Sequence, residues 1–98
     1  MATISKRLMR KPMPIVSTFF GIIIRMYYGD HPPPHFHAEY QGQRAIFDFN
    51  GTLLAGSIKS ATARRLIKMW CKRHNEELIV NWARIEEGQV INRIDSLE

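Results

Sequence analysis

The sequence predicts an α+β fold, in which a small four-stranded, mostly antiparallel sheet carries two C-terminal helices on one face. Short β-branched and aromatic segments, separated by glycine and proline turns, fill the first part of the 98-residue chain. From Ser60 onward the apolar residues recur with a helical period instead. Strands that precede helices, rather than alternating with them, are typical of this class. The length is enough for one domain and too short for two.

Four segments are expected to form the strands, because each is rich in β-branched and aromatic residues and is bounded by turn residues. They span residues 20–28, 35–40, 43–49 and 52–58. The first is apolar on both faces apart from Arg25, which predicts a central position in the sheet. Between the first and second strands, residues 29–34 must form a loop, because three successive prolines fix φ and remove hydrogen-bond donors.

Two dipeptides predict the register of the last three strands. Gln41-Gly42 and Asn50-Gly51 are typical of two-residue hairpin turns, and Asn-Gly favours type I′, with positive φ at both positions. The first turn pairs His35 with Asp48 and His37 with Ile46. One face of the sheet then collects the apolar side chains of Phe36, Ala38, Tyr40, Ala45, Phe47, Phe49 and Leu54. The opposite face collects His35, His37, Glu39, Arg44 and Asp48, with Ile46 and Leu53.

The helical region is expected to divide in two near His74–Asn75. Ser60 is a good N-cap for the first helix, and basic residues up to His74 suit its C-terminus. Asn75 can cap a second helix, which begins with two glutamates and ends at Gly88. The apolar stripe predicts core positions for Trp70 and Trp82 and a buried, unreactive thiol for Cys71.

The positive charge is concentrated at the N-terminus. The formal net charge is +5, and Lys6, Arg7, Arg10 and Lys11 supply four of the fourteen basic residues. No acidic residue precedes Asp30, so residues 13–98 hold ten basic and nine acidic residues, a net charge of +1. We therefore expect a disordered basic extension over residues 1–12 and a nearly neutral α+β domain over residues 13–98.

Composition also suggests where the protein works. No apolar run approaches the roughly 18 residues of a membrane span. No hydrophobic segment follows the first basic residues, as a secretory signal would require. Cys71 is the single cysteine, which excludes an internal disulfide and favours a reducing compartment. These features predict a cytoplasmic protein with no membrane association.

The segment from Met13 to Phe49 resembles a bacterial family catalogued as domain of unknown function 4160. The resemblance is carried by Met13-Pro14, by the run Phe19 to Ile22, and by the string from Asp30 to His37, which follows the pattern DHxPPHFH. It extends more loosely through Trp70, Leu78 and Trp82. It implies a bacterial origin and a gene beside a second small gene, as in toxin–antitoxin pairs. It implies no activity, and residues 1–12 precede the usual start of the family.

The histidines of this string, with two carboxylates, are the strongest candidates for a chemical site. His35 and His37 lie two residues apart on a strand, so they point the same way and could share a zinc or manganese ion with Asp48. Without a metal, Asp30, His31, His35 and Asp48 could perform acid–base catalysis. The alternative is an ordinary solvated sheet face, in which His35–Asp48 and Glu39–Arg44 are simple cross-strand pairs.

Three classes of function remain open. The first is an interaction protein that binds the product of a neighbouring small gene, or a second copy of itself, through a sheet edge. The second is a hydrolase, metal-dependent or acid–base, that uses the histidine face, with RNA as one candidate substrate. The third is a nucleic-acid-binding module, whose basic helix face would comprise Arg64, Arg65, Lys68, Lys72 and Arg73. We favour the first; whether the protein is an enzyme is left open by the sequence.

Overall fold

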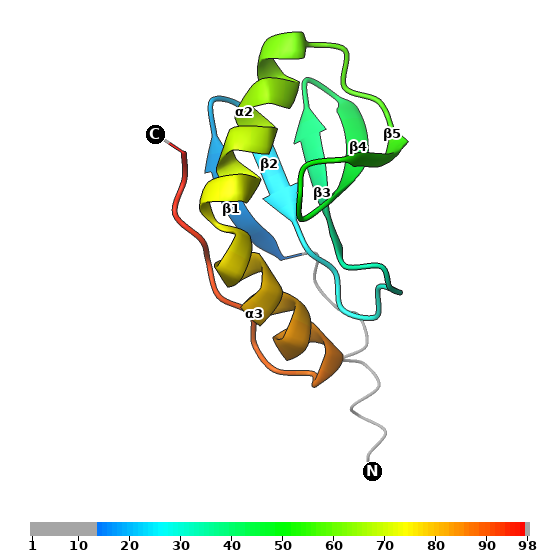
Figure 1. The fold of residues 1–98 in the computed structure, drawn as a ribbon, viewed down its shortest axis with the longest axis vertical. Coiled ribbons are helices and arrows are strands. Elements are labelled where there is room, and N and C mark those ends of the chain that lie inside the picture. Colours follow the sequence, from blue (N-terminus) through cyan, green and yellow to red (C-terminus); the bar gives the residue numbers. More distant parts are fainter. Residues whose placement is uncertain (1–13, 98) are drawn as a thin grey trace.

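The computed structural model describes residues 14–97, so the basic extension predicted over residues 1–12 lies outside the described part of the chain. The predicted α+β class is confirmed, but the sheet has five strands rather than four. The elements are β1 (Ile15–Phe19), β2 (Ile22–Arg25), β3 (His35–Tyr40), β4 (Gln43–Asp48), β5 (Leu53–Gly56), α2 (Ala61–Arg73) and α3 (Asn75–Glu86). The strands lie in sequence order and every neighbouring pair is antiparallel. Both helices lie on the same side of the sheet (Figure 1).

The strand predicted over residues 20–28 is present as the shorter β2, whereas β1 was not predicted; a tight turn at Phe20-Gly21 joins the two strands. Both residues have positive φ, 49° and 79°, as a type I′ turn requires. An aromatic residue rarely adopts this conformation, so the dipeptide lacks the usual hairpin signal. The expected central position holds for β2, which lies between β1 and β3 and buries Ile22 and Ile24 completely.

The β3–β4 hairpin has the predicted register, whereas the following turn differs from the prediction. Gln41 and Gly42 have φ values of 49° and 78°, and the strands pair from His35↔Asp48 to Tyr40↔Gln43. At the next turn only Gly51 has positive φ, so the expected two-residue type I′ turn is wrong. The loop has three residues, 49–51, closed by backbone bonds from Asp48 N to Thr52 O and from Gly51 N to Asp48 O, both 3.0 Å.

The helices divide where the sequence predicted. The Ser60 side chain caps α2 by accepting a hydrogen bond from Ala63 N at 3.0 Å, and α2 ends at Arg73. The residue that caps α3 is His74 rather than Asn75. The Asn75 side chain instead donates to the carbonyl oxygen of Phe49 at 3.0 Å, which ties the start of α3 to the β4–β5 loop. Gly88, with φ of 71°, follows α3 as expected.

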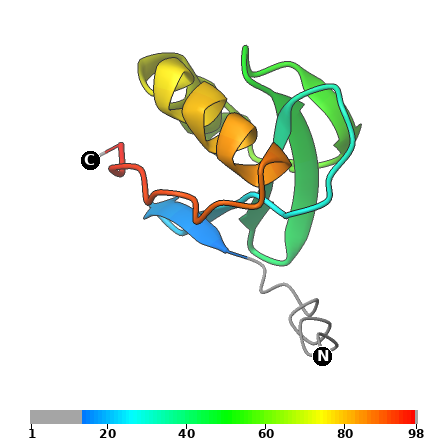
Figure 2. The same ribbon diagram turned by 90° about the horizontal axis from the view of Figure 1, so that it is seen from below.

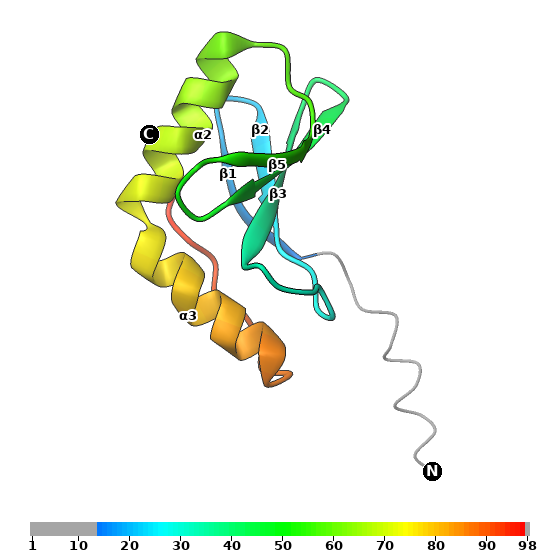
Figure 3. The ribbon, with the colours of Figure 1, turned by 45° about the vertical axis from the view of Figure 1, so that its right-hand side comes forward.

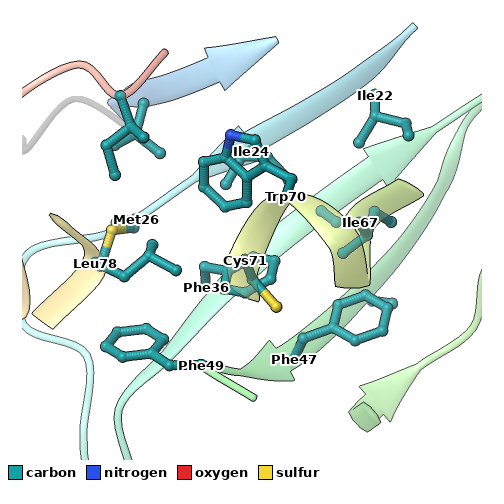
Figure 4. Packing of buried hydrophobic residues seen from close by; sticks show 14 of the residues in the cluster. Ile22, Ile24, Met26, Phe36, Phe47, Phe49, Ile67, Trp70, Cys71 and Leu78 are labelled. Carbon is teal, nitrogen blue, oxygen red and sulfur yellow. The ribbon is translucent and has the colours of Figure 1, made fainter. Parts of the chain in front are cut away.

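The core lies between the helices and the face of the sheet that carries Phe36 and Phe47. Figure 4 shows Trp70 and Ile67 of α2 lying over these rings, with Leu78 of α3 beside Met26. Trp70, Trp82 and Cys71 are buried, as predicted. The predicted core position of Leu54 is wrong: it is 44% exposed, because β5 is an edge strand whose four residues are all exposed.

The two edges of the sheet are finished differently. Along β1, the backbone N–H of Ile94 donates to the carbonyl of Val16 at 2.8 Å, and the indole N–H of Trp70 donates to the Asp95 carbonyl at 2.9 Å. The C-terminal segment thereby lies beside β1, as Figure 2 shows. At the other edge, β5 curls away across the direction of β1 and β2 (Figure 3). No neighbouring strand covers β5 within residues 14–97.

Candidate metal centre

The centre of the site is a carboxylate held between two imidazoles. His35 and His37 flank the buried Phe36 on β3, so strand alternation sends both rings to the face opposite the Phe36 side chain. The loop between β2 and β3 brings Asp30 to the same place. One oxygen, Asp30 Oδ2, lies 3.0 Å from Nε2 of His35 and 3.1 Å from Nε2 of His37. Among residues 14–97 these three form the one group of potential metal ligands of this kind.

The spacing of these ligand atoms fits one metal ion. The three atoms lie within 4.8 Å of one another. Nitrogen and oxygen ligands bind zinc at about 2.0–2.2 Å, so two ligands on one ion stand roughly 3.0–3.5 Å apart at octahedral or tetrahedral angles. The two Asp30–histidine separations match that range without movement of the backbone. An ion there would have three protein ligands and at least one open position.

The Pro33 carbonyl fixes the orientation of the His35 ring. Nδ1 of His35 lies 2.7 Å from this oxygen, which can only accept, so Nδ1 carries the proton. In the neutral ring, Nε2 therefore holds a lone pair, and it faces the Asp30 carboxylate. The ring therefore faces an acceptor at each nitrogen, the Pro33 carbonyl at Nδ1 and the Asp30 carboxylate at Nε2. This arrangement is favourable when a second proton or a cation lies between Nε2 and Asp30. A metal-ligating histidine whose other nitrogen donates to a backbone carbonyl is the usual outer-shell arrangement.

Packing around the rings restricts water. The side chains of His35 and His37 are 12% and 23% exposed. Burial lowers the pKa of His37 below its ordinary value of 6.5, against the opposing effect of its hydrogen bond to Asp30. This favours the neutral imidazole that a metal needs. The Tyr27 ring meets His37 edge-on, with centroids 4.4 Å apart.

His35 lies on the predicted face of the sheet, but the expectation that this face stands clear of the helices is wrong for its ring. Its centroid lies 5.4 Å from that of Trp82, because α3 extends past the end of the sheet and reaches the start of β3. This contact with the buried Trp82 shields one side of the His35 ring from water. The site thus lies at the end of the sheet rather than in the middle of a solvated face.

The predicted third ligand, Asp48, lies opposite His35 in register, but its carboxylate serves the turn. Asp48 Oδ1 accepts hydrogen bonds at 2.9 Å from the backbone N–H groups of Asn50 and Thr52. An aspartate two residues before Asn-Gly commonly forms such a turn, and this was the available signal. The structure therefore assembles Asp30 with the two histidines, in place of Asp48.

His31 is not part of the group, although it adjoins Asp30 in sequence. Its side chain is exposed, and its ring nitrogens are not among the clustered ligand atoms. Of the residues predicted to be catalytic, the structure thus brings together Asp30 and His35. It adds His37, which the sequence had assigned to metal binding alone.

A cavity of about 300 Å³ adjoins the candidate metal centre on the outer face of the sheet; we refer to it as the adjoining cavity. It is lined by Tyr27, His37, Ala38, Glu39, Arg44, Ala45, Ile46, Ala55 and Gly56. Arg25 Nε lies 3.0 Å from Glu39 Oε2, and Arg44 Nε lies 3.8 Å from the same oxygen. His37 thus belongs both to the candidate metal ligands and to the wall of the cavity.

The family model described as a domain of unknown function (DUF4160) matches residues 21–83. The chain belongs to this family. The matched region of this DUF4160 protein contains the candidate metal ligands and the adjoining cavity, and it leaves out the β1 strand, the last residues of α3 and the C-terminal segment. Searches of curated proteins and of solved structures find no match. Within the described residues of the DUF4160 protein, no helix is long and apolar enough to cross a membrane.

The basic residues of α2 are exposed, but two of them are engaged with the chain itself. Arg64 donates through Nη1 to the carbonyls of Ile58 and Lys59, at 2.7 and 2.8 Å, and Arg73 donates to the carbonyl of Leu97 at 3.1 Å. The remaining predicted nucleic-acid contacts are Arg65, Lys68 and Lys72. In this DUF4160 protein the arginines at both ends of the basic helix face therefore support local structure.

Proposed function

We propose that the protein binds a divalent transition-metal ion through Asp30, His35 and His37, and that it acts as a metal-dependent hydrolase. The observation that carries the proposal is the orientation of the His35 imidazole. Its Nδ1 is hydrogen-bonded to the Pro33 carbonyl oxygen, and its Nε2 faces the Asp30 carboxylate, which also contacts His37. Two neutral nitrogens and one carboxylate oxygen are ligands that zinc accepts readily, and manganese is the alternative.

The open side of this ligand set supports a catalytic rather than a structural role. Structural zinc sites are closed by four protein ligands, whereas catalytic sites keep three and leave a position for water or substrate. A zinc ion in such a setting lowers the pKa of water to about 7 and polarises carbonyl or phosphoryl oxygens. Here the adjoining cavity gives a small substrate access to the His37 side of the centre.

The experiment is a denaturation series with added Zn²⁺ or Mn²⁺. A ligand that binds only the folded state adds RT ln(1 + [L]/Kd), about 2.7 kcal/mol at one hundred times Kd. We expect the wild type to gain stability to this extent. The gain should disappear in His35→Ala, His37→Ala and Asp30→Asn.

Two matched controls distinguish the ligand sets. His31→Ala removes the neighbouring exposed histidine, and Asp48→Asn keeps an oxygen for the turn while removing the charge. Both should respond to metal as the wild type does. If the stability gain with metal were lost in Asp48→Asn and kept in Asp30→Asn, the ligands would be His35, His37 and Asp48, as the sequence predicted. A wild-type curve indifferent to every divalent ion would eliminate the metal, and would leave acid–base catalysis by Asp30 and His35 as the enzyme hypothesis.

A second candidate function is supported by the edge strand β5. All four of its residues are exposed, and Leu53 and Leu54 are 48% and 44% exposed. An uncovered edge with apolar side chains is suited to pairing with a strand from another chain. The partner in this proposal is the product of a neighbouring small gene, in a module similar to a toxin–antitoxin pair.

Co-expression of the two genes tests the partner. We expect the two products to purify as a complex, and we expect growth inhibition by one product to be relieved by the other. Leu54→Lys should weaken the complex, because a lysine on an edge strand opposes further pairing. His35→Ala should leave it intact. Failure of the two products to co-purify would count against the interaction, whatever the result with metals.

A further inference from the structure

We propose that the adjoining cavity binds a small organic anion whose apolar body lies on Ile46 and Ala55 and whose negative group pairs with Arg44. The opposite end of this ligand points to His37. If a metal ion is bound as in the proposed function, this end of the ligand would also meet the ion, and that part alone rests on the proposed function. The anion site itself depends on the walls and charges of the cavity.

The walls select a small and partly apolar ligand. The volume of about 300 Å³ is at the lower end of small-molecule pockets, so it suits one ring or a short chain. Tyr27, Ile46 and Ala55 supply apolar surface. At Gly56 the lining is backbone, and β5 lies close to β4 there: a Cβ on Gly56 would lie 2.4 Å from the Arg44 carbonyl oxygen and 2.8 Å from Ala45 Cα.

Asp30 lies beside His37 at one end of the cavity, so it is at the Arg44 end that the charges favour an anion. Glu39 is the single acid of the lining, and it is paired with Arg25 at 3.0 Å. Arg44 Nε lies 3.8 Å from Glu39 Oε2, and the Arg44 side chain is 82% exposed. The Glu39 carboxylate thus faces two guanidinium groups, and that of Arg44, which is held more weakly, lies at the rim of the cavity. A guanidinium presents a planar pair of donors that suits a carboxylate or a phosphate.

The spacing of the two ends limits the length of the ligand. Glu39 stands opposite Arg44, two residues along β3 from His37. Two residues of a strand span about 6.6 Å. A six-membered ring with a substituent at each end covers this distance. The geometry therefore fits a molecule such as an aromatic or cyclic acid, with its reactive group para to the carboxylate, better than it fits a polymer.

The test compares benzoate with benzamide, which share a shape and differ in charge. Each is titrated into the full-length, metal-free protein at low ionic strength, and binding is followed by NMR shifts of the Tyr27, Ile46 and Ala55 amides. We expect benzoate to bind about three- to fivefold more tightly, the range of an exposed ion pair. The preference should fall at high salt. Using metal-free protein keeps this result independent of the metal titrations.

Three variants complete the test. Arg44→Gln should abolish the preference for benzoate. Ala55→Leu should weaken both probes by filling the cavity, and the exposure of Ala55 makes this change compatible with folding. His31→Ala, outside the cavity, should change nothing. Equal binding of the two probes, a preference that survives Arg44→Gln, or no shift of the cavity amides with either probe would overturn the anion site. The metal centre would be unaffected by that outcome.

Discussion

Consecutive residues of β3 face two different environments. Phe36 is fully buried and stacks on Phe47 at a centroid distance of 5.8 Å, under Trp70 of α2. His37, the next residue, bonds to Asp30 on the opposite face and borders the adjoining cavity. The helix-covered face is held by packing, and the outer face is organised by hydrogen bonds and charge. Substitutions on the first face should therefore change stability, and those on the second should change ligand binding.

The largest expected effect tests this contrast at adjacent positions. Phe36→Ala removes a buried ring and leaves a cavity, which should lower the free energy of unfolding by about 3–5 kcal/mol. His37→Ala should cost about 1 kcal/mol or less, the net value of one hydrogen bond, while abolishing the response to metal. Urea denaturation of both variants, with and without Zn²⁺, measures each quantity. Equal losses of stability would contradict the division between the faces.

The second prediction compares the two aspartates of the outer face. Asp48→Ala should cost about 1–2 kcal/mol, because two backbone N–H groups lose their acceptor, a loss comparable to that of a helix cap. Asp48→Asn should cost less, since the amide oxygen can still accept. Asp30→Asn should leave stability within about 1 kcal/mol and affect metal binding instead. If Asp30→Asn proved the more destabilising change, the carboxylate between the histidines would have a structural role.

The last prediction concerns Cys71, which lies in the core beneath the β4–β5 loop. Burial raises its pKa to about 11, with the Asp48 charge as a further cause. Because the unfolded thiol, with a pKa near 9.0, loses its proton first, the folded state should lose stability as the pH rises from about 9 to 11. The free energy of unfolding should fall less steeply with pH in Cys71→Ala than in the wild type. Denaturation of both proteins at pH 8 and pH 10 measures this difference. A thiol reagent that labels the folded protein rapidly at pH 8 would contradict this burial.

The sequence predicted the face of each β3 and β4 residue because a two-residue turn determines register and alternation does the rest. It could not predict which carboxylate meets His35, since register gives the position of Asp48 and not the direction of its side chain. The amides of Asn50 and Thr52 compete for that oxygen and hold it. The contact of Asp30 with the two histidines depends on the path of the loop between β2 and β3, whose sequence has no periodic pattern from which that path could be predicted. The hairpin at Phe20-Gly21 was missed because phenylalanine is an unusual residue for a left-handed turn.

The adjoining cavity was also beyond sequence reasoning. Its shape depends on a register shift between Ile46 and Phe47 and on the close crossing at Gly56, which together curl β5 over the outer face. Such a shift adds local twist that an alternating pattern does not encode. The sequence contained Arg44 and Glu39 as an ordinary cross-strand pair. That Arg25 takes the better contact with Glu39 follows from the pairing of β2 with β3, which the sequence analysis had not predicted.

The bond between Ile94 and Val16 also has a consequence for the order in which the protein is made. Synthesis proceeds from the N-terminus, so β1 emerges among the first described residues and the segment that covers it among the last. Until residues 94 and 95 are available, the nascent sheet has two uncovered edges instead of one. The indole N–H of Trp70 also lacks its acceptor, the Asp95 carbonyl, during this interval. Closure at this edge thus has to follow synthesis of residues 94 and 95, and a ribosome stalled before them would hold a chain prone to pairing with its neighbours.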